Sequence, residues 1–199
     1  MLLDIPDGDF AGYIFDCDGT LADTMPLHYR AWLQAFQDYK MLFDFTEDKF
    51  YSMGGISTSR FVAVLNEEHG TDYDCEKIAS HKEAIFMAML PGVKPINPVC
   101  DFARRAAADG LPVSVASGGF PDVVARTLQL IGMSDIFGDR VVTPDMVEHG
   151  KPAPDIFLYA AGLMNVAPEK CLVFEDAVPG QKGARAAGMQ VVIVPSRVL

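Results

Sequence analysis

Two pairs of acidic residues in this sequence each directly follow a short apolar segment. Asp16 and Asp18 follow one segment near the N-terminus, and Glu175 and Asp176 follow another near the C-terminus. Such segments predict buried parallel strands, and ligands bind beyond the carboxyl ends of these strands. Two carboxylate clusters at one sheet edge would repel each other unless a hard cation such as Mg²⁺ lay between them. Either pair alone is also typical of a turn or a helix cap, but together they favour a magnesium site.

A hydroxyl residue, a glycine and a lysine add the features of a phosphate site. Ser117 and Gly118 directly follow another apolar segment, so a hydroxyl and backbone N–H groups should face the same sheet edge. Lys151 lies between glycine and proline in the run Gly-Lys-Pro-Ala-Pro-Asp, and the two prolines restrict that loop. Singly, the serine is typical of a turn and the lysine of a surface. Beside the carboxylates, they indicate binding of a phosphoryl group.

Five short, mostly apolar segments supply the strands that must position these residues. Amphipathic helical patterns separate them, which predicts an α/β fold with a Rossmann-like, doubly wound parallel sheet covered by helices. The predicted strands are Gly12 to Phe15, Val113 to Ala116, Arg140 to Val142, Cys171 to Phe174 and Gln190 to Val194.

Between the first two strands lies a long stretch with several helical stripes and little strand signal. Its boundaries fall near Thr24 and near Pro91 and Gly92. The stretch is too long for one crossover helix, so we expect residues 1–24 and 91–199 to form the α/β core and residues 25–90 an inserted helical domain. The alternative is an ordinary crossover whose extra helices lie on the sheet.

Composition excludes several classes of protein. The chain has 199 residues, half of them apolar, and a formal charge of −11, which argues against a broad nucleic-acid or anionic-membrane surface. Its apolar runs are too short to span a bilayer, and its N-terminus shows no secretory signal. Four scattered cysteines have no metal-ligand spacing, which is typical of reduced thiols in a cytoplasmic protein. We expect a cytoplasmic monomer.

The order of these motifs resembles the haloacid dehalogenase-like superfamily. Its members similarly have Asp-x-Asp-Gly-Thr after a first strand, followed along the chain by a serine, a lysine and an acidic pair. The resemblance runs from about Ala11 to Pro195. The stretches 23–32 and 151–157 resemble its β-phosphoglucomutase-like subgroup. That subgroup contains sugar-phosphate phosphatases and mutases, and it carries a helical cap where the inserted helices are expected here.

The resemblance implies a role for each motif residue. Asp16 would be the nucleophile that forms an aspartyl-phosphate, and Asp18 the general acid and base. Ser117, Gly118 and Lys151 would bind the phosphoryl group. Thr20 would be an orienting hydroxyl. The implied Mg²⁺ ligands are Asp16, Asp18 through its carbonyl, Glu175 and Asp176.

The expected cap would supply specificity and close over the substrate, with hinges at Asp23–Thr24 and Pro91–Gly92. The cap residues expected to bind substrate are His28, Thr58, Arg60 and Lys82, although His28, Arg60 and Lys82 are each also typical of a helix surface. His28 fits the mutase pattern. Thr58, however, stands where a mutase is expected to have an arginine for the second phosphate, and Arg60 resembles the pattern of small sugar phosphatases.

These observations favour a Mg²⁺-dependent phosphatase acting on a small phosphorylated sugar or similar metabolite. A β-phosphoglucomutase-type mutase is the alternative. A phospho-signalling receiver is the non-enzyme alternative, since it too combines aspartates, a hydroxyl residue, a lysine and Mg²⁺. A receiver would need neither the second aspartate of the first motif nor an inserted helical domain.

Overall fold

The core of the molecule is a parallel β-sheet. The computed structural model describes residues 3–54, 56 and 58–195. Within them, five strands pair in the order β3-β2-β1-β4-β5, and every pair is parallel. Their bounds are β1 Gly12–Phe15, β2 Val113–Ala116, β3 Val141–Val142, β4 Cys171–Glu175 and β5 Gln190–Ile193. The predicted Rossmann-like α/β fold is confirmed, and the predicted strands differ from the observed ones only at their ends.

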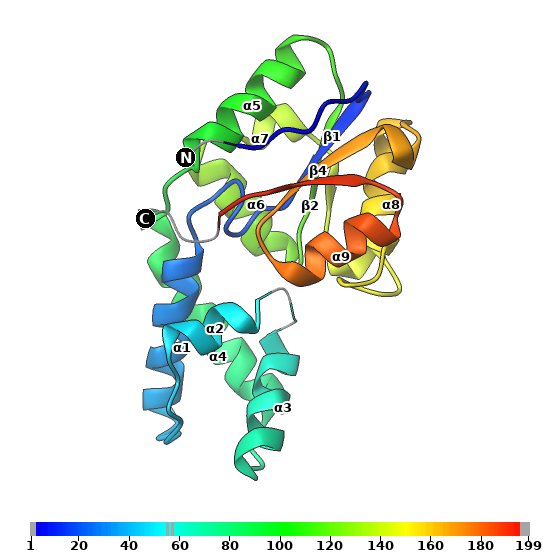
Figure 1. Ribbon diagram of the computed structural model, residues 1–199. Coiled ribbons are helices and arrows are strands. Elements are labelled where there is room, and N and C mark those ends of the chain that lie inside the picture. The colour runs from blue at the N-terminus through cyan, green and yellow to red at the C-terminus, as the bar shows by residue number, and fades with distance from the viewer. Residues whose placement is uncertain (1–2, 55, 57, 196–199) are drawn as a thin grey trace.

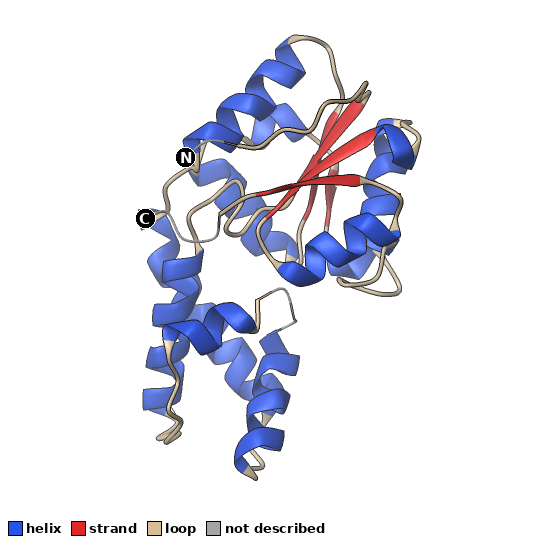
Figure 2. Cartoon of the chain, viewed as in Figure 1, coloured by secondary structure: helices blue, strands red, loops and turns tan. Residues whose placement is uncertain are grey.

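Helices cover both faces of the sheet (Figures 1 and 2). Alternate strand residues point to opposite faces, so Phe15 and Phe174 pack on one side with their rings stacked 4.8 Å apart, while Ile14 and Val173 pack on the other. The first face is covered by α5 (Asn97–Ala108), α6 (Pro121–Leu130) and α7 (Ser134–Phe137). The second is covered by α8 (Asp155–Met164) and α9 (Val178–Ala186). Short 3₁₀ turns are η1 Leu90–Gly92, η2 Pro144–Met146 and η3 Pro168–Lys170.

Four helices between β1 and β2 form a bundle that extends away from the carboxyl ends of the strands (Figure 1). This helical bundle comprises α1 (Met25–Asp38), α2 (Glu47–Ser52), α3 (Thr58–His69) and α4 (Cys75–Met89). It has its own aromatic core, in which Trp32 and Phe61 stack at 4.4 Å. The short helix α2 was not predicted, because six residues are too few to show a helical stripe. The helices pack on one another rather than across the sheet, and their assignment as a separate domain stays a prediction.

Two neighbouring chain segments connect the helical bundle to the sheet. Their backbones are hydrogen-bonded, from Asp23 N–H to the Lys94 carbonyl at 2.9 Å and from Ile96 N–H to the Leu21 carbonyl at 2.8 Å. A separate apolar cluster of α1, α4 and α6 residues lies at the same junction. The predicted hinges at 23–24 and 91–92 therefore lie in or beside these connections. Among the described residues, no helix has both the length and the apolar character needed to cross a membrane.

Candidate active site

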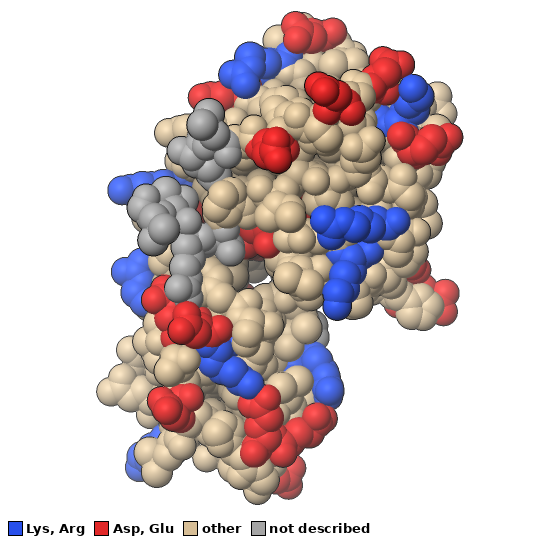
Figure 3. Space-filling view, viewed as in Figure 1, with Lys and Arg blue, Asp and Glu red and all other residues tan. Residues whose placement is uncertain are grey.

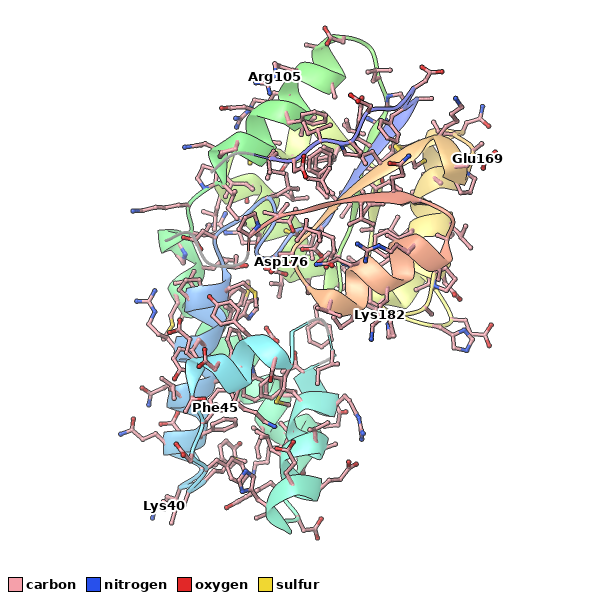
Figure 4. The ribbon with its side chains drawn as sticks, in the orientation of Figure 1. Lys40, Phe45, Arg105, Glu169, Asp176 and Lys182 are labelled. Atoms are coloured by element: carbon pink, nitrogen blue, oxygen red, sulfur yellow. The ribbon has the colours of Figure 1, made fainter. Side chains whose placement is uncertain are left out.

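A cavity of about 290 Å³ lies between the carboxyl ends of the strands and the helical bundle. Figure 4 shows Asp176 at the end of the sheet that faces the helices. We call the side formed by residues outside the bundle the sheet wall, and the side formed by bundle residues the helical wall. The charged residues of the sheet wall include Asp16, Asp18, Lys151, Glu175 and Asp176. Among the described residues, the polar ones of the helical wall are His28, Thr58, Lys82 and Glu83, set among aromatic and aliphatic side chains.

Lys151 connects two of the carboxylates of the sheet wall. Its Nζ donates to Asp16 Oδ1 at 2.6 Å and to Glu175 Oε2 at 2.8 Å. The lysine side chain is only 3% exposed, and its ammonium lies 5.3 Å from the centre of the Phe157 ring. Burial opposes the charge of Lys151, yet the two carboxylates together raise its pKa, so it is a fixed cation. The lysine that the sequence places in a proline-restricted loop is thus aimed at Asp16.

The carboxylates of the sheet wall outnumber the cations beside them. Oxygen atoms of Asp16, Glu175 and Asp176 lie within 4.8 Å of one another, and all three residues are buried. Burial, followed by repulsion from Asp16, raises the pKa of Glu175 to about 8, although Lys151 opposes this. Burial and then the charges of Asp16 and Glu175 raise the pKa of Asp176 as well. An oxygen-rich cluster with unbalanced negative charge fits a hard divalent cation such as Mg²⁺. The Asp18 side chain is not part of this cluster.

Gly19 allows Asp176 to approach the first motif. Its φ of +80° lies in the left-handed region, which glycine adopts without steric cost. A Cβ atom at this position would clash with the Asp176 carboxylate. The Asp-Gly turn after β1 therefore also leaves the space that the acidic cluster needs.

Asp18 belongs to a second set of contacts, which reaches into the helical bundle. The Thr24 hydroxyl donates to Asp18 Oδ1 at 2.7 Å, and His28 Nε2 lies 3.4 Å from the same oxygen. Burial alone would raise the pKa of Asp18, but the contacts with His28 and Thr24 lower it overall. Asp18 is therefore a carboxylate in this state.

Lys82 continues this set of contacts along the helical wall. Its Nζ lies 2.7 Å from His28 Nδ1 and 2.9 Å from Glu83 Oε1, and its side chain is 3% exposed. Burial and then the neighbouring Lys82 charge lower the pKa of His28, so the imidazole is neutral. A neutral ring that accepts from Lys82 at Nδ1 carries its proton on Nε2, directed at Asp18. Thr58 completes the set by donating to Glu83 Oε1 at 2.7 Å.

Ser117 and the following glycines lie at the end of β2. Ser117 is fully buried, and its hydroxyl accepts a hydrogen bond from the Gly119 N–H at 3.1 Å. Gly118 and Gly119 line the cavity. A Cβ atom on Gly119 would lie 3.3 Å from Ser117 Oγ and 3.4 Å from Asp18 Oδ2, so this glycine separates the two oxygens. In this state the Ser117 hydroxyl stabilises the loop after β2 through its hydrogen bond with Gly119. Direct contact of Ser117 with phosphate stays a prediction.

Two residues lie differently from what the sequence suggested. Arg60 does not line the cavity but pairs with Glu67 at 2.9 Å on an exposed face of α3. The Thr20 hydroxyl, expected to orient the site, is buried without a hydrogen-bond partner among the described residues. Thr24 makes the contact with Asp18 instead, because the turn after Gly19 brings the start of α1 back to the strand end.

Sequence reasoning missed two residues of this site. Thr24 was assigned only to a hinge, although its position at the start of a helix beside the first motif was a usable signal. Glu83 was not singled out at all. Its position next to Lys82 looked like an ordinary charged helix surface, and only the packing of α3 against α4 places it at the cavity.

Comparisons with known proteins show which proteins this chain is similar to. A family model described as haloacid dehalogenase-like hydrolase matches residues 10–188. The chain is 37% identical over 186 residues to the fructose-1-phosphate phosphatase YqaB of Escherichia coli (strain K12), covering 93% of this chain and 96% of that protein. It is 27% identical to the 6-phosphogluconate phosphatase of the same organism, covering 89% and 79%.

A solved structure of β-phosphoglucomutase from Clostridium difficile has a similar fold. It matches with a TM-score of 0.77 at 24% identity, covering 92% of this chain and 83% of that one. This likeness concerns the fold alone.

Proposed function

Because the chain belongs to the haloacid dehalogenase-like hydrolases, we propose that it is a Mg²⁺-dependent phosphatase of small phosphorylated sugars that acts through an aspartyl-phosphate. The observation that carries the proposal is the buried Asp16 carboxylate, held by Lys151 at the cavity with a second carboxylate, Asp18, two residues away.

Asp16 and Asp18 divide the reaction into two transfers. An Asp16 oxygen attacks phosphorus, the bond from phosphorus to the sugar oxygen breaks, and Asp18 protonates the departing alkoxide. The charge of a bound phosphate raises the pKa of a nearby carboxyl group, which favours the protonated Asp18 that this step needs. Asp18 then removes a proton from water, which attacks phosphorus and releases inorganic phosphate and the free Asp16 carboxylate. Lys151 stabilises the charge on the transferring oxygens.

Asp16, Glu175 and Asp176 are the side chains suited to hold Mg²⁺, with the Asp18 carbonyl as a further predicted ligand. When bound, the cation would offset the charge of both the carboxylates and the phosphoryl group. Without it, three buried acidic groups share one lysine. That imbalance supports the proposal, because the same residues would be costly as a purely structural cluster.

The substrate class follows from the cavity and from the relatives. A cavity of about 290 Å³ is of the size that suits a small metabolite. Both curated relatives described above are named as phosphatases of phosphorylated sugars or sugar acids, which favours hydrolysis over mutase activity. Thr58 supports the same choice, since a hydroxyl at this position cannot neutralise a second phosphate.

The charge of −11 opposes a polyanionic partner, and Figure 3 shows Asp and Glu scattered over the visible face with Lys and Arg between them, rather than one continuous basic surface. A monomeric state and a cytoplasmic location stay predictions.

A phosphate-release assay tests this function. The full chain is incubated with fructose 1-phosphate, 6-phosphogluconate and β-glucose 1-phosphate, with Mg²⁺ or with a chelator, and glucose 6-phosphate is measured in parallel. We expect Mg²⁺-dependent release of phosphate from at least one sugar phosphate and little glucose 6-phosphate. Rapid formation of glucose 6-phosphate without free phosphate would show a mutase instead.

A further inference from the structure

Glu83 presents an uncommitted carboxylate oxygen on the helical wall. Both of its hydrogen bonds, from Thr58 at 2.7 Å and from Lys82 at 2.9 Å, end on Oε1. The described residues supply no donor to Oε2. This oxygen is not a buried unsatisfied atom, since within the described chain only the Thr20 hydroxyl is of that kind. Oε2 is therefore accessible, and the Glu83 side chain, which is 15% exposed, lines the cavity.

The charges of the helical wall leave no cation for a second anion. Among the described residues that line the cavity, Lys82 is the one lysine or arginine contributed by the bundle. It is already shared between Glu83 and His28, and the other lining lysine, Lys151, is held by Asp16 and Glu175. An anionic group brought to the helical wall would therefore meet the Glu83 carboxylate and no unpaired positive side chain.

Glu83 lies on the helical wall, whereas the predicted reacting groups Asp16 and Asp18 lie on the sheet wall. Three successive contacts connect its carboxylate to Asp18, through Lys82 and His28, at 2.9, 2.7 and 3.4 Å. A sugar whose leaving oxygen is next to Asp18 extends its remaining carbons toward the helical wall. A carboxylate oxygen accepts hydrogen bonds from sugar hydroxyls, whereas a phosphate or carboxylate in the same place would be repelled.

We propose that Glu83 is a specificity-determining residue that accepts a hydrogen bond from a distal hydroxyl of the substrate and rejects substrates with a second anionic group. The preferred substrate class is thus a monophosphate whose other end is a neutral polyol. This inference rests on the proposed phosphatase function, and it deepens that function by naming which sugar phosphates the site selects. It also predicts discrimination against 6-phosphogluconate, whose carboxylate is a second anion.

The test compares two phosphates of one sugar, fructose 1-phosphate and fructose 1,6-bisphosphate, by kcat/KM. The wild-type chain should prefer the monophosphate by about 10-fold or more, the ratio expected when one like-charge contact is avoided. Glu83→Gln keeps the shape but removes the charge, so the preference should fall to within about threefold. Most of that change should come from a lower KM for the bisphosphate. Glu83→Asp keeps the charge and should retain the preference.

Two controls separate this inference from the function on which it rests. Glu76→Gln makes the same chemical change at an exposed position of the same helix, α4, and should leave the ratio unchanged. Hydrolysis of p-nitrophenyl phosphate, which has no sugar hydroxyls, reports whether each variant is folded and competent. If Glu83→Gln hydrolyses this probe but keeps the wild-type preference, the role of Glu83 is wrong and the phosphatase stands. If the wild-type chain releases phosphate from none of these compounds, both proposals fall.

Discussion

The sheet wall and the helical wall of the cavity differ in charge balance: negative charge is in excess on the sheet wall, whereas the charges of the helical wall are paired. Among the described residues of the sheet wall, Lys151 is the one cation beside several carboxylates, and burial followed by repulsion from Asp16 raises the pKa values of Glu175 and Asp176. On the helical wall, the one lysine is matched by Glu83 and contacts a neutral histidine. An unbalanced set of buried charges is suited to a cation and a phosphoryl group. A set of paired charges is suited to binding neutral groups of a substrate, such as sugar hydroxyls.

The two walls also differ in how they are built. The acidic residues Asp16, Glu175 and Asp176 of the sheet wall stand at or just beyond the ends of the paired strands β1 and β4, so the hydrogen-bond register of the sheet fixes their spacing. The polar residues of the helical wall come from three helices, α1, α3 and α4, whose relative positions depend on side-chain packing. We therefore expect substitutions of the sheet wall to affect chemistry and those of the helical wall to affect substrate choice.

Asp16→Asn should have the largest effect. Loss of the nucleophilic oxygen should lower kcat for phosphate release by about 10⁴-fold, because the covalent step has no substitute. Steady-state kinetics measure the effect, and Asp9→Asn, at an exposed residue near the start of the chain, serves as the matched control. Retention of substantial turnover in Asp16→Asn would refute the assignment of Asp16 as the nucleophile. It would also contradict the expectation that the sheet wall carries out the chemistry and the helical wall selects the substrate.

Lys151→Met should have the next largest effect, and on two properties. It should lower kcat by about 10²-fold, since one charged stabiliser of the transferring phosphoryl group is lost. It should also lower the free energy of unfolding by about 3 kcal/mol, because Asp16 and Glu175 remain buried without their shared cation. Chemical denaturation measures the stability, and added Mg²⁺ should restore part of it. Unchanged stability would mean that the carboxylates do not need Lys151.

Thr58→Val should have the smallest effect, since it changes the helical wall without changing its charge. Loss of the hydrogen bond to Glu83 should raise KM for fructose 1-phosphate by about threefold and leave kcat nearly unchanged, because a neutral hydrogen bond contributes about 1 kcal/mol. Initial-rate kinetics with a full substrate titration separate the two parameters. A fall in kcat as large as that of Lys151→Met would contradict the contrast between the walls.

Much of the fold and of the sheet wall was predictable from the sequence. The five strands were recognisable because buried parallel strands are short apolar runs, and Asp16, Asp18, Lys151, Glu175 and Asp176 all line the cavity as expected. Their neighbours along the chain indicate where each strand ends. Parallel pairing then brings those ends to one edge without further information.

The helical wall was only partly predictable. His28, Thr58 and Lys82 line the cavity, whereas Arg60 lies on an exposed face of α3. Glu83 also lines the cavity, although no sequence motif indicated it. Helical periodicity identifies the apolar stripe of each helix but leaves several polar positions at its margins. Which of these positions reaches the cavity depends on the rotation of α1, α3 and α4 about their axes.

The sequence by itself thus determined that acidic pairs, a serine and a lysine meet at one end of a parallel sheet. It did so because strand direction is a local property and sheet pairing is regular. Only the tertiary structure decided that Thr24 rather than Thr20 contacts Asp18, and that Glu83 lines the cavity with both of its hydrogen bonds on one oxygen. Both outcomes depend on contacts between segments that turns and packed helices bring together. The energies of such contacts depend on residues far apart in the sequence, so local sequence patterns do not reveal them.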